Sequence, residues 1–320
     1  MWCLLGGVLI ISIFTFEANS FKFGTLGRRN QSDRPPTCIR SVRMAAEGVE
    51  SCAREAALSA GKIMIEGRDK LSLEDVISKQ GSRDILTEYD TACQNKIYEV
   101  IKSKFPGHAF LGEEDVAPGR DAATEAIKKL SNEDHLWIVD PIDGTTNFAH
   151  NMPLSGIIIA YCERGECTFG LIYDPFADEM FTAWRGKGAF MNLKKISVDS
   201  ISDMKNAVLC TGSPPNIDSL NGCLKASLAL SSQCRTVRIL GSAAINLAWV
   251  ACGRLTCYFE TDMNVWDVAA GSLIVEEAGG KVSDVYGNPY KLETRSYVSS
   301  NGHIHDELQS KLLEAGMVMP

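Results

Sequence analysis

The sequence has no internal repeat, no low-complexity tract and, after its first 43 residues, no proline- or glycine-rich linker. Its hydrophobic content of 45% and charged content of 22% lie close to the average of globular proteins. A collagenous, coiled-coil or disordered chain is therefore excluded. A chain of 320 residues can bury a sizeable core, as one large domain or as two closely joined ones.

Basic residues are too few for a nucleic-acid-binding face. The 32 lysines and arginines are outnumbered by 40 aspartates and glutamates, so the net charge is −8. Six of the bases and two of the acids precede Met44, which leaves 26 bases, 38 acids and a net charge of −12 for the rest of the chain. We therefore expect no nucleic-acid partner. An acidic protein can still bind an anionic small molecule if a metal ion lies between them.

The eleven cysteines lack the spacings of metal or disulfide motifs. There is no CxxC pair and no cysteine–histidine cluster with the spacing of a zinc site. Nine of the cysteines follow Met44, in segments whose patterns indicate strand and helix interiors. We predict buried, reduced thiols rather than a disulfide framework.

No apolar run is long enough to span a bilayer, which takes about 20 residues. The run from Leu4 to Phe16 instead suits the hydrophobic region of a signal peptide, and the basic, acid-poor stretch from Phe21 to Arg43 is typical of transit peptides. This order is similar to the two-part plastid presequences of algae with secondary plastids. We expect residues 1–43 to be a removable presequence for a plastid, without stable membrane association. The alternatives are secretion and a cytoplasmic protein that starts at Met44.

The rest of the chain alternates helical and strand patterns. Apolar residues recur at helical spacing in two segments, and other short apolar runs predict strands. The predicted elements are helices at Glu47–Glu66 and Thr87–Lys104, a hairpin at Asp75–Leu86, strands at Ala109–Leu111 and Leu136–Val139, a meander over residues 156–191, and alternating helices and strands from Ser219 to Ala315. Because Pro141 lacks an N–H, we expect the chain to leave its strand at Asp140. The pattern predicts an α/β or α+β fold.

Three groups of acidic residues lie beside predicted strands or helices. Glu113 follows the first short strand, Asp140 and Asp143 follow the second, and Asp267 directly precedes a predicted helix. Strands that end in carboxylates bring them to a sheet edge, and oxygen atoms are the ligands that Mg²⁺ prefers. A lone aspartate is usually a solvated loop residue or a helix cap, so the prediction rests on the whole set.

The segment Asp140-Pro141-Ile142-Asp143-Gly144-Thr145 combines two carboxylates with a sharp turn. Gly144 permits a close backbone approach, and Thr145 can begin a helix whose free N–H groups face an anion. Hard cations and phosphate groups meet at such a place. The segment therefore predicts a site where metal ions hold a phosphate.

This segment resembles a motif of the inositol monophosphatase family. Further motifs of that family resemble Gly-Glu-Glu before the segment and Trp-Asp-Val-Ala-Ala-Gly and Glu-Ala-Gly-Gly after it. The resemblance runs from about Glu47 to the C-terminus, in order and with similar spacing. It implies a layered α-β-α-β-α sandwich of the inositol monophosphatase and fructose-1,6-bisphosphatase type. It also implies a Mg²⁺-dependent, lithium-sensitive phosphatase in a single catalytic domain over residues 44–320.

The resemblance also implies roles for individual residues. Two or three Mg²⁺ ions would bind Glu113, Asp140, the carbonyl of Ile142, Asp143 and Asp267. The catalytic residues would be Glu113, Thr145, Asp90 and Lys79, with Asp90 and Thr145 assisting the activation of a water. The substrate would contact Asp143, Gly144, Thr145, Ala243, Glu260 and Asp267.

The activity that the resemblance favours is hydrolysis of inositol monophosphate to myo-inositol and phosphate by a metal-activated water. Histidinol phosphate, sugar 1-phosphates and 3′-phosphoadenosine 5′-phosphate are alternative substrates for the same chemistry. A non-catalytic, metal-dependent binding or scaffold protein is the alternative of a different class, and the complete set of ligand residues argues against it. The expected partner is a small phosphorylated polyol, and the resemblance also implies a homodimer.

Overall fold

The computed structural model describes residues 37–79 and 81–318. From Met44 onward the described residues form one compact unit. The first helix, α1 (Thr37–Arg68), begins before Met44, so the predicted boundary falls inside a helix. Residues 1–36, which carry most of the predicted presequence, lie outside the described residues.

The larger sheet has seven strands in the order β3-β4-β5-β6-β7-β8-β9. All neighbours are antiparallel except β3 and β4, which are parallel. Their bounds are β3 Ala109–Gly112, β4 Leu136–Asp143, β5 Gly156–Glu163, β6 Glu166–Asp174, β7 Glu179–Trp184, β8 Gly188–Met191 and β9 Lys194–Lys195. The meander predicted over residues 156–191 is confirmed as β5 to β8.

The second sheet has five strands in the order β11-β10-β12-β14-β13, with parallel and antiparallel pairs. A separate two-stranded hairpin, β1–β2, precedes both sheets along the chain. The bounds are β1 Ile77–Ser78, β2 Ile85–Leu86, β10 Val208–Thr211, β11 Thr236–Ile239, β12 Cys257–Thr261, β13 Lys281–Ser283 and β14 Ser296–Ser300. The predicted hairpin is confirmed, whereas β10 was not predicted.

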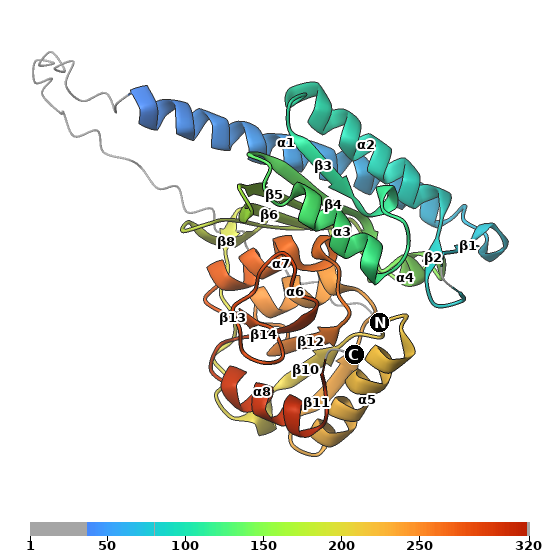
Figure 1. Ribbon diagram of the computed structural model, residues 1–320, viewed down its shortest axis with the longest axis vertical. Helices are drawn as coiled ribbons and strands as arrows, with labels where there is room; N and C mark the ends of the chain where they lie inside the picture. Colours follow the sequence, from blue (N-terminus) through green and yellow to red (C-terminus); the bar gives the residue numbers. More distant parts are fainter. Residues whose placement is uncertain (1–36, 80, 319–320) are drawn as a thin grey trace, which may run out of the picture. The chain divides into compact units, whose positions relative to one another are not determined.

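The helices and the two sheets form five layers (Figure 1). Helices α1 and α2 cover one face of the seven-stranded sheet, α6 and α7 lie between the sheets, and α5 and α8 cover the far face of the five-stranded sheet. The bounds after α1 are α2 Glu88–Lys104, α3 Arg120–Leu130, α4 Thr145–Ala149, α5 Ile217–Ser231, α6 Ala243–Ala251, α7 Val265–Glu277 and α8 His305–Glu314. The α-β-α-β-α sandwich predicted from the sequence is confirmed.

Strand β4 shows how the sequence builds these layers. Because successive side chains of a strand point to opposite faces, Trp137 and Val139 pack against α1 and α2, while Leu136 and Ile138 pack toward α6 and α7. Both faces are buried, and each residue from Leu136 to Val139 is accordingly apolar.

The prediction that the chain leaves the strand at Asp140 is wrong. Strand β4 continues to Asp143, which lies opposite Gly156, and the pairing shifts register between Asp140 and Asp143. A bulge leaves a residue outside the hydrogen-bonded ladder, so Pro141 sits where its missing N–H costs no ladder bond. The bulge also places both carboxylates at the end of one strand.

The nine cysteines that follow Met44 are all free thiols, and seven of them are buried. Burial raises the pKa of Cys52 to about 11, so its thiol remains protonated at neutral pH. The prediction of reduced, mostly buried cysteines is confirmed for these nine residues.

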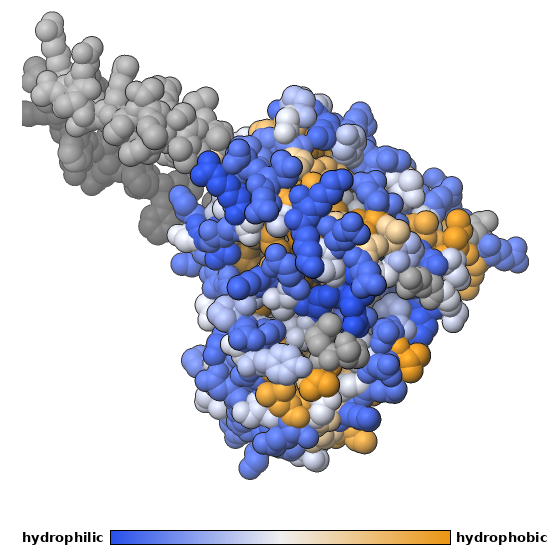
Figure 2. Space-filling view, in the orientation of Figure 1, coloured by the Kyte–Doolittle hydropathy of each residue, from blue (hydrophilic) through white to orange (hydrophobic). Residues whose placement is uncertain are grey.

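The surface is largely hydrophilic on the face seen in Figure 2. Apolar colour gathers at the right-hand edge, over the β1–β2 hairpin, where Leu73 and Ile77 are exposed. None of the described helices combines the length and apolarity needed to cross a bilayer.

A buried histidine predicts how the stability of the fold depends on pH. His305 is fully buried, with Nδ1 2.9 Å from the Ser300 hydroxyl and Nε2 2.9 Å from the Ser283 hydroxyl. Burial, assisted by the charge of Lys281, lowers its pKa from 6.5 to about 4. The folded protein therefore takes up this proton less readily than the unfolded chain. The contribution of neutral, buried His305 to stability is complete above pH 6.5 and is lost as the pH falls toward 4.

Because of this histidine, we expect the free energy of unfolding to fall by about 2 kcal/mol as the pH is lowered from 7.5 to 5. Urea unfolding of wild type and His305→Gln across that range measures the difference, because the variant lacks the titrating group. The exposed neighbour His303 provides the control, and His303→Gln should keep the wild-type pH dependence. Parallel pH profiles for wild type and His305→Gln would contradict the prediction.

Candidate active site

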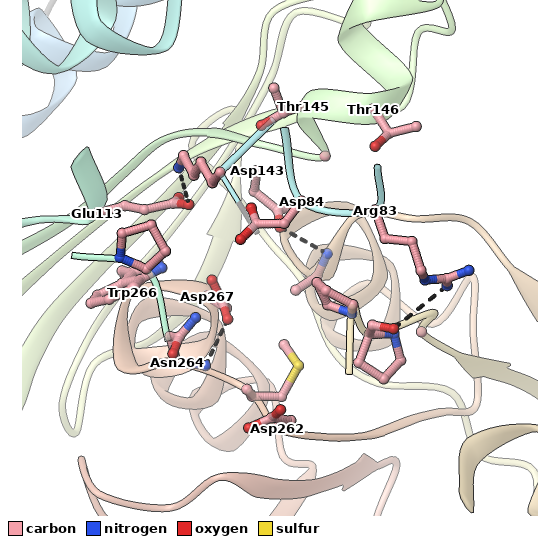
Figure 3. Close-up of a pocket in the computed structure, with 18 of the residues that line it drawn as sticks. Arg83, Asp84, Glu113, Asp143, Thr145, Thr146, Asp262, Asn264, Trp266 and Asp267 are labelled. Carbon is pink, nitrogen blue, oxygen red and sulfur yellow. Dashed lines mark hydrogen bonds and ion pairs between the residues drawn. The ribbon is translucent and has the colours of Figure 1, made fainter. Parts of the chain in front are cut away.

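A cavity of about 270 Å³ collects most of the residues that the sequence singled out (Figure 3). Its walls come from the β1–β2 hairpin, the segment after β3, the junction of β4 with α4, and the loops around β10, α6 and β12. The predicted residues that line it are Lys79, Glu113, Asp143, Gly144, Thr145, Ala243, Glu260 and Asp267. The remaining three, Asp90, Asp140 and Ile142, are buried behind the wall.

Asp140 lies buried at the β4 bulge, where its Oδ1 accepts a hydrogen bond of 3.1 Å from the N–H of Ile142. Burial raises the pKa of Asp140 well above its usual range, and the negative charges of Glu113, Asp143 and Asp267 add to the shift. Carboxylates that raise one another's pKa in this way lie close together.

Asp143 connects the larger sheet to helix α6. It accepts hydrogen bonds from the Ser242 hydroxyl and from the N–H groups of Ala243 (3.2 Å) and Ala244 (2.8 Å). Burial raises the pKa of Asp143 to about 6, and these three donors oppose the rise. Ala243 was predicted to contact substrate, and in this structure its N–H is directed at Asp143. Ser242, which sequence reasoning gave no role in the site, precedes α6 as its N-cap.

Glu113 lies in a short 3₁₀ helix directly after β3 and is paired with Lys79 from the hairpin. The ammonium group of Lys79 lies 3.0 Å from Glu113 and 3.0 Å from Glu114. Burial alone would lower the pKa of Lys79, but the two glutamates raise it above its usual range. Burial and the charge of Glu113 raise the pKa of Glu114 to about 7.

Asp90 and Thr145 form a hydrogen-bonded pair between α2 and α4. The backbone N–H and hydroxyl of Thr87 donate to Asp90 Oδ2 (2.8 and 2.5 Å), which closes the capping box of α2. The Thr145 hydroxyl lies 3.0 Å from Asp90 Oδ1 and 3.0 Å from the carbonyl oxygen of Ile142. Burial raises the pKa of Asp90 to about 6, and the Thr87 donors oppose this rise.

Gly144 is the N-cap of α4 and has a left-handed backbone, with φ of 84°. A Cβ at this position would lie 3.0 Å from the carbonyl oxygen of Leu154 and 3.1 Å from that of Gly241. Both the backbone angle and the close packing therefore require glycine, as the sequence predicted for a tight turn.

Glu260 occupies a buried position in β12, with the hydroxyl of Tyr258 donating to its Oε2. Burial raises the pKa of Glu260 to about 8, and this hydrogen bond opposes the rise. Gly212 lies directly against the carboxyl group, because a Cβ there would overlap it. Sequence reasoning missed both Tyr258 and Gly212. Tyr258 lies two residues before Glu260 on the same face of β12, so the strand period could have identified it, whereas Gly212 reaches Glu260 only because β10 pairs with β12.

Asp267 lies in the first turn of α7, which begins three residues earlier than predicted, at Val265. Its Oδ2 accepts a 2.7 Å hydrogen bond from the N–H of Asn264. Burial raises the pKa of Asp267 well above its usual range, with a further contribution from the charge of Glu113. The turn before α7 is fixed by Asp262, a residue with φ of 69° that is paired with Arg120 and Arg295.

The donor chemistry at this site fits a hard divalent cation. The four carboxylates and the Ile142 carbonyl offer only oxygen ligands, and the raised pKa values of Asp140 and Asp267 indicate a place where positive charge is needed. Among the described residues, however, no three side chains of aspartate, glutamate, histidine or cysteine lie close enough together to hold a metal ion. Asp143 and Glu113 are instead directed at α6 and Lys79.

Comparisons with known proteins agree with this geometry. Residues 45–316 match the model of the inositol monophosphatase family. Inositol monophosphatase 3 of Solanum lycopersicum is 39% identical over 265 residues, which are 82% of this chain and 95% of that protein. Inositol monophosphatase 1 of Mus musculus is 36% identical over 71% of this chain and 80% of its own length.

Solved structures show the same relationship. The inositol monophosphatase TM1415 of Thermotoga maritima superposes with a TM-score of 0.72 at 34% identity, over 82% of this chain and 95% of that one. The extragenic suppressor protein SuhB of Bartonella henselae gives 0.73 at 32% identity, over 82% and 98%. The chain therefore belongs to the inositol monophosphatase family and is a phosphoric monoester hydrolase.

Proposed function

We propose that this protein hydrolyses inositol monophosphate to myo-inositol and phosphate, with Mg²⁺ as its cofactor. The observation that carries the proposal is a cavity lined by Glu113, Asp143, Asp267 and Thr145. Asp140, the Ile142 carbonyl and Asp90, the partner of Thr145, are buried behind its wall. The names of the tomato and mouse relatives support inositol phosphate as the substrate class.

The residues that would hold Mg²⁺ are Glu113, Asp140, Asp143, Asp267 and the carbonyl of Ile142. Bound Mg²⁺ supplies a coordinated water of lowered pKa and positive charge beside the phosphate oxygens. Without a cation, the same carboxylates repel a phosphate, so activity depends on their neutralisation.

The protein's own groups position the reactants. The Thr145 hydroxyl can pass its proton to Asp90 Oδ1, 3.0 Å away, and so accept a proton from the attacking water. Backbone N–H groups of Gly144 and Thr145 at the start of α4 orient the phosphate oxygens. Glu260, which also lines the cavity, accepts hydrogen bonds from hydroxyl groups of the leaving alcohol.

A panel of phosphate monoesters tests the proposal. Phosphate release is measured with inositol 1-phosphate, histidinol phosphate, glucose 1-phosphate and 3′-phosphoadenosine 5′-phosphate, each with Mg²⁺ and with excess chelator. We expect turnover only with the metal, and the highest kcat/KM with inositol 1-phosphate. Equal or higher kcat/KM with another member of the panel would overturn the assignment of substrate but leave the phosphatase activity standing.

Replacing Glu260 should impair turnover of a polyol phosphate selectively. At pH 8.5, above the pKa of about 8, Glu260→Gln removes a carboxylate acceptor. We expect kcat/KM for inositol 1-phosphate to fall roughly five- to 150-fold, which corresponds to about 1–3 kcal/mol of lost transition-state stabilisation. At pH 6.5 the loss should be smaller, because glutamine resembles the protonated acid. Glycerol 2-phosphate, with fewer hydroxyl groups, is the control substrate. Equal losses on both substrates would assign Glu260 a general structural role instead.

Lithium should inhibit the enzyme. Li⁺ has nearly the radius of Mg²⁺ but half its charge, so it can occupy an all-oxygen site without giving the same stabilisation to phosphate transfer. We expect inhibition that is uncompetitive with respect to substrate at tens of millimolar Li⁺, with K⁺ at the same concentration as the control. If the rate of hydrolysis is unchanged in Li⁺, the protein is not a lithium-sensitive phosphatase.

A further inference from the structure

Three residues, Asp262 to Asn264, connect strand β12, which carries Glu260, to helix α7, which carries Asp267. Asp262 has a left-handed backbone, with φ of 69°. Among the described non-glycine residues with such a backbone, it is the only one that lines the cavity. Glycine would adopt this conformation at a lower free-energy cost, because it has no Cβ. The contacts of the Asp262 side chain offset this cost.

Arg295, which directly precedes β14, holds this connection by four hydrogen bonds. Its Nη2 donates to Asp262 Oδ1 at 2.8 Å and to the carbonyl oxygen of Asp262 at 3.4 Å. Its Nη1 donates to Asn264 Oδ1 at 3.0 Å, and its carbonyl oxygen accepts from the N–H of Met263 at 2.9 Å. Asn264 in turn donates its N–H to Asp267 Oδ2 at 2.7 Å (Figure 3). Arg295 therefore fixes the backbone that places Asp267.

Arg120, the first residue of helix α3, binds the same carboxylate from a different segment. Its Nε lies 2.9 Å from Asp262 Oδ1, the oxygen that Arg295 also binds. A positive side chain in the first turn of a helix is unfavourable, because this end of the helix is itself positive, and Asp262 neutralises the charge. Although burial alone would raise the pKa of Asp262, the hydrogen bonds from Arg120 and Arg295 hold it below its usual range.

The ion pair of Arg120 with Asp262 joins the segments that carry two of the proposed cation ligands. Glu113 lies seven residues before Arg120, and residues 116–119 between them also line the cavity. Asp267 lies five residues after Asp262, in the first turn of α7. Strand β3, which precedes Glu113, belongs to the seven-stranded sheet, and β12 belongs to the five-stranded sheet. The pair therefore links ligand-bearing segments of both sheets.

The effect of this link is expected at the site rather than on the whole fold. The side chains of Arg120 and Asp262 are 33% and 13% exposed, and ion pairs at partly exposed positions contribute little to the free energy of unfolding. Cation binding is more sensitive to the position of ligands. Mg²⁺ requires oxygen ligands in a nearly ideal octahedron, whereas Ca²⁺ accepts irregular arrangements at longer distances. A displaced ligand segment should therefore weaken Mg²⁺ binding more than Ca²⁺ binding.

We propose that Arg120, Asp262 and Arg295 are positioning residues that together fix Asp267 relative to Glu113, and so set the affinity and selectivity of the site for Mg²⁺. The inference rests on the proposed function, because it takes Glu113 and Asp267 as cation ligands. Replacing groups that orient metal ligands without touching the metal typically weakens metal binding ten- to hundredfold.

Cation binding without turnover tests the proposal. The metal-free, full-length protein is titrated with Mg²⁺ or Ca²⁺ in the absence of substrate, and each Kd is obtained from the rise in melting temperature. Asp262→Asn keeps the size of the side chain and tolerates a left-handed backbone. We expect it to raise the Kd for Mg²⁺ by about tenfold and the Kd for Ca²⁺ by no more than about threefold.

Replacing Arg120 shows whether the two side chains act through each other. Arg120→Gln should raise the Kd for Mg²⁺ less than Asp262→Asn does, because Arg295 still holds Asp262. The double variant should bind Mg²⁺ no more weakly than Asp262→Asn alone, since Arg120 acts only through Asp262. If Asp262→Asn does not fold, Arg120→Gln still tests the proposal, because its side chain is partly exposed.

A second ion pair between distant segments provides the matched control. Arg254 lies 2.5 Å from Glu179, and the two side chains are 39% and 18% exposed, close to the values for Arg120 and Asp262. Neither residue belongs to the cavity lining. Arg254→Gln therefore removes a comparable ion pair away from the site and should leave both Kd values unchanged.

An unchanged Kd for Mg²⁺ in both Arg120→Gln and Asp262→Asn would overturn the inference. Equal losses of Mg²⁺ and Ca²⁺ binding, or a similar loss in Arg254→Gln, would also overturn it, because they would indicate a general loosening of the fold. Phosphate release measured in parallel separates this inference from the proposed function. Selective loss of Mg²⁺ binding in a protein whose wild type hydrolyses no phosphate monoester would support the positioning role and overturn the proposed function. A wild type that Mg²⁺ does not stabilise would overturn both.

Discussion

Asp140→Asn is expected to lower kcat/KM by at least about a thousandfold while the protein stays folded. Asp140 is buried behind the cavity wall, and the charges of Glu113, Asp143 and Asp267, the other proposed cation ligands, add to the rise of its pKa. Asparagine keeps the shape and an oxygen that can accept from the N–H of Ile142, so the change removes charge and little else. Retention of more than a tenth of the wild-type rate at saturating Mg²⁺ would remove Asp140 from the metal-binding set.

The same substitution has an effect on stability that does not depend on turnover. Because burial and the neighbouring acids raise the pKa of Asp140, its ionised form destabilises the metal-free folded protein at neutral pH. With excess chelator, Asp140→Asn should therefore melt at a higher temperature than wild type. Added Mg²⁺ should raise the melting temperature of the wild type more than that of the variant, since only the wild type has the complete set of ligands.

Asp174 provides the control for replacing a buried aspartate. It lies at the end of β6, outside the cavity lining, and accepts hydrogen bonds from the N–H groups of Phe176 and Ala177. Asp174→Asn keeps an acceptor for that turn, so turnover and the response to Mg²⁺ should stay near wild type. A similar loss of activity in both variants would mean that the effect of Asp140→Asn is not specific to the site.

The parts of the site that could be predicted from sequence are those encoded by residues close together in the chain. Asp140, Asp143 and Gly144 lie within five consecutive residues at the end of β4, and Thr87 and Asp90 form a capping box of four residues. In such cases the local spacing and the residue types determine the geometry. Most of the strands and helices were predictable for the same reason, because each is indicated by the spacing of apolar residues within its own segment.

The parts that sequence did not predict depend on contacts between distant segments. Ser242 and Ala244 bind Asp143 across about 100 residues, and Asp262 is held by Arg120 and Arg295 from two other segments. Pro141 was misjudged for a related reason. Its lack of an N–H indicates a strand end, but pairing with β5 on the far side of the bulge keeps β4 in the sheet.

Asp90→Asn is expected to lower kcat by about a hundred- to thousandfold with little change in KM, because the residue acts on the proton rather than on substrate binding. Two donors from Thr87 hold one oxygen of Asp90, and the other oxygen faces the Thr145 hydroxyl at 3.0 Å. In the variant the side-chain oxygen would remain with Thr87, so the NH₂ group would face Thr145. The Thr145 hydroxyl would then donate to the Ile142 carbonyl, also 3.0 Å away, and could no longer pass its proton to residue 90.

The pH profile distinguishes this role from helix capping. With a pKa of about 6, Asp90 should make the wild-type kcat rise as the pH increases through about 6, and this limb should be absent in Asp90→Asn. Thr87→Val leaves the carboxyl group in place but removes the hydroxyl donor that lowers its pKa, so the limb should move to higher pH. If Asp90 only capped α2, both variants would be less stable and neither would change the position of the limb. A shift in Thr87→Val together with its loss in Asp90→Asn follows only if the proton that leaves the water passes through Thr145 to Asp90.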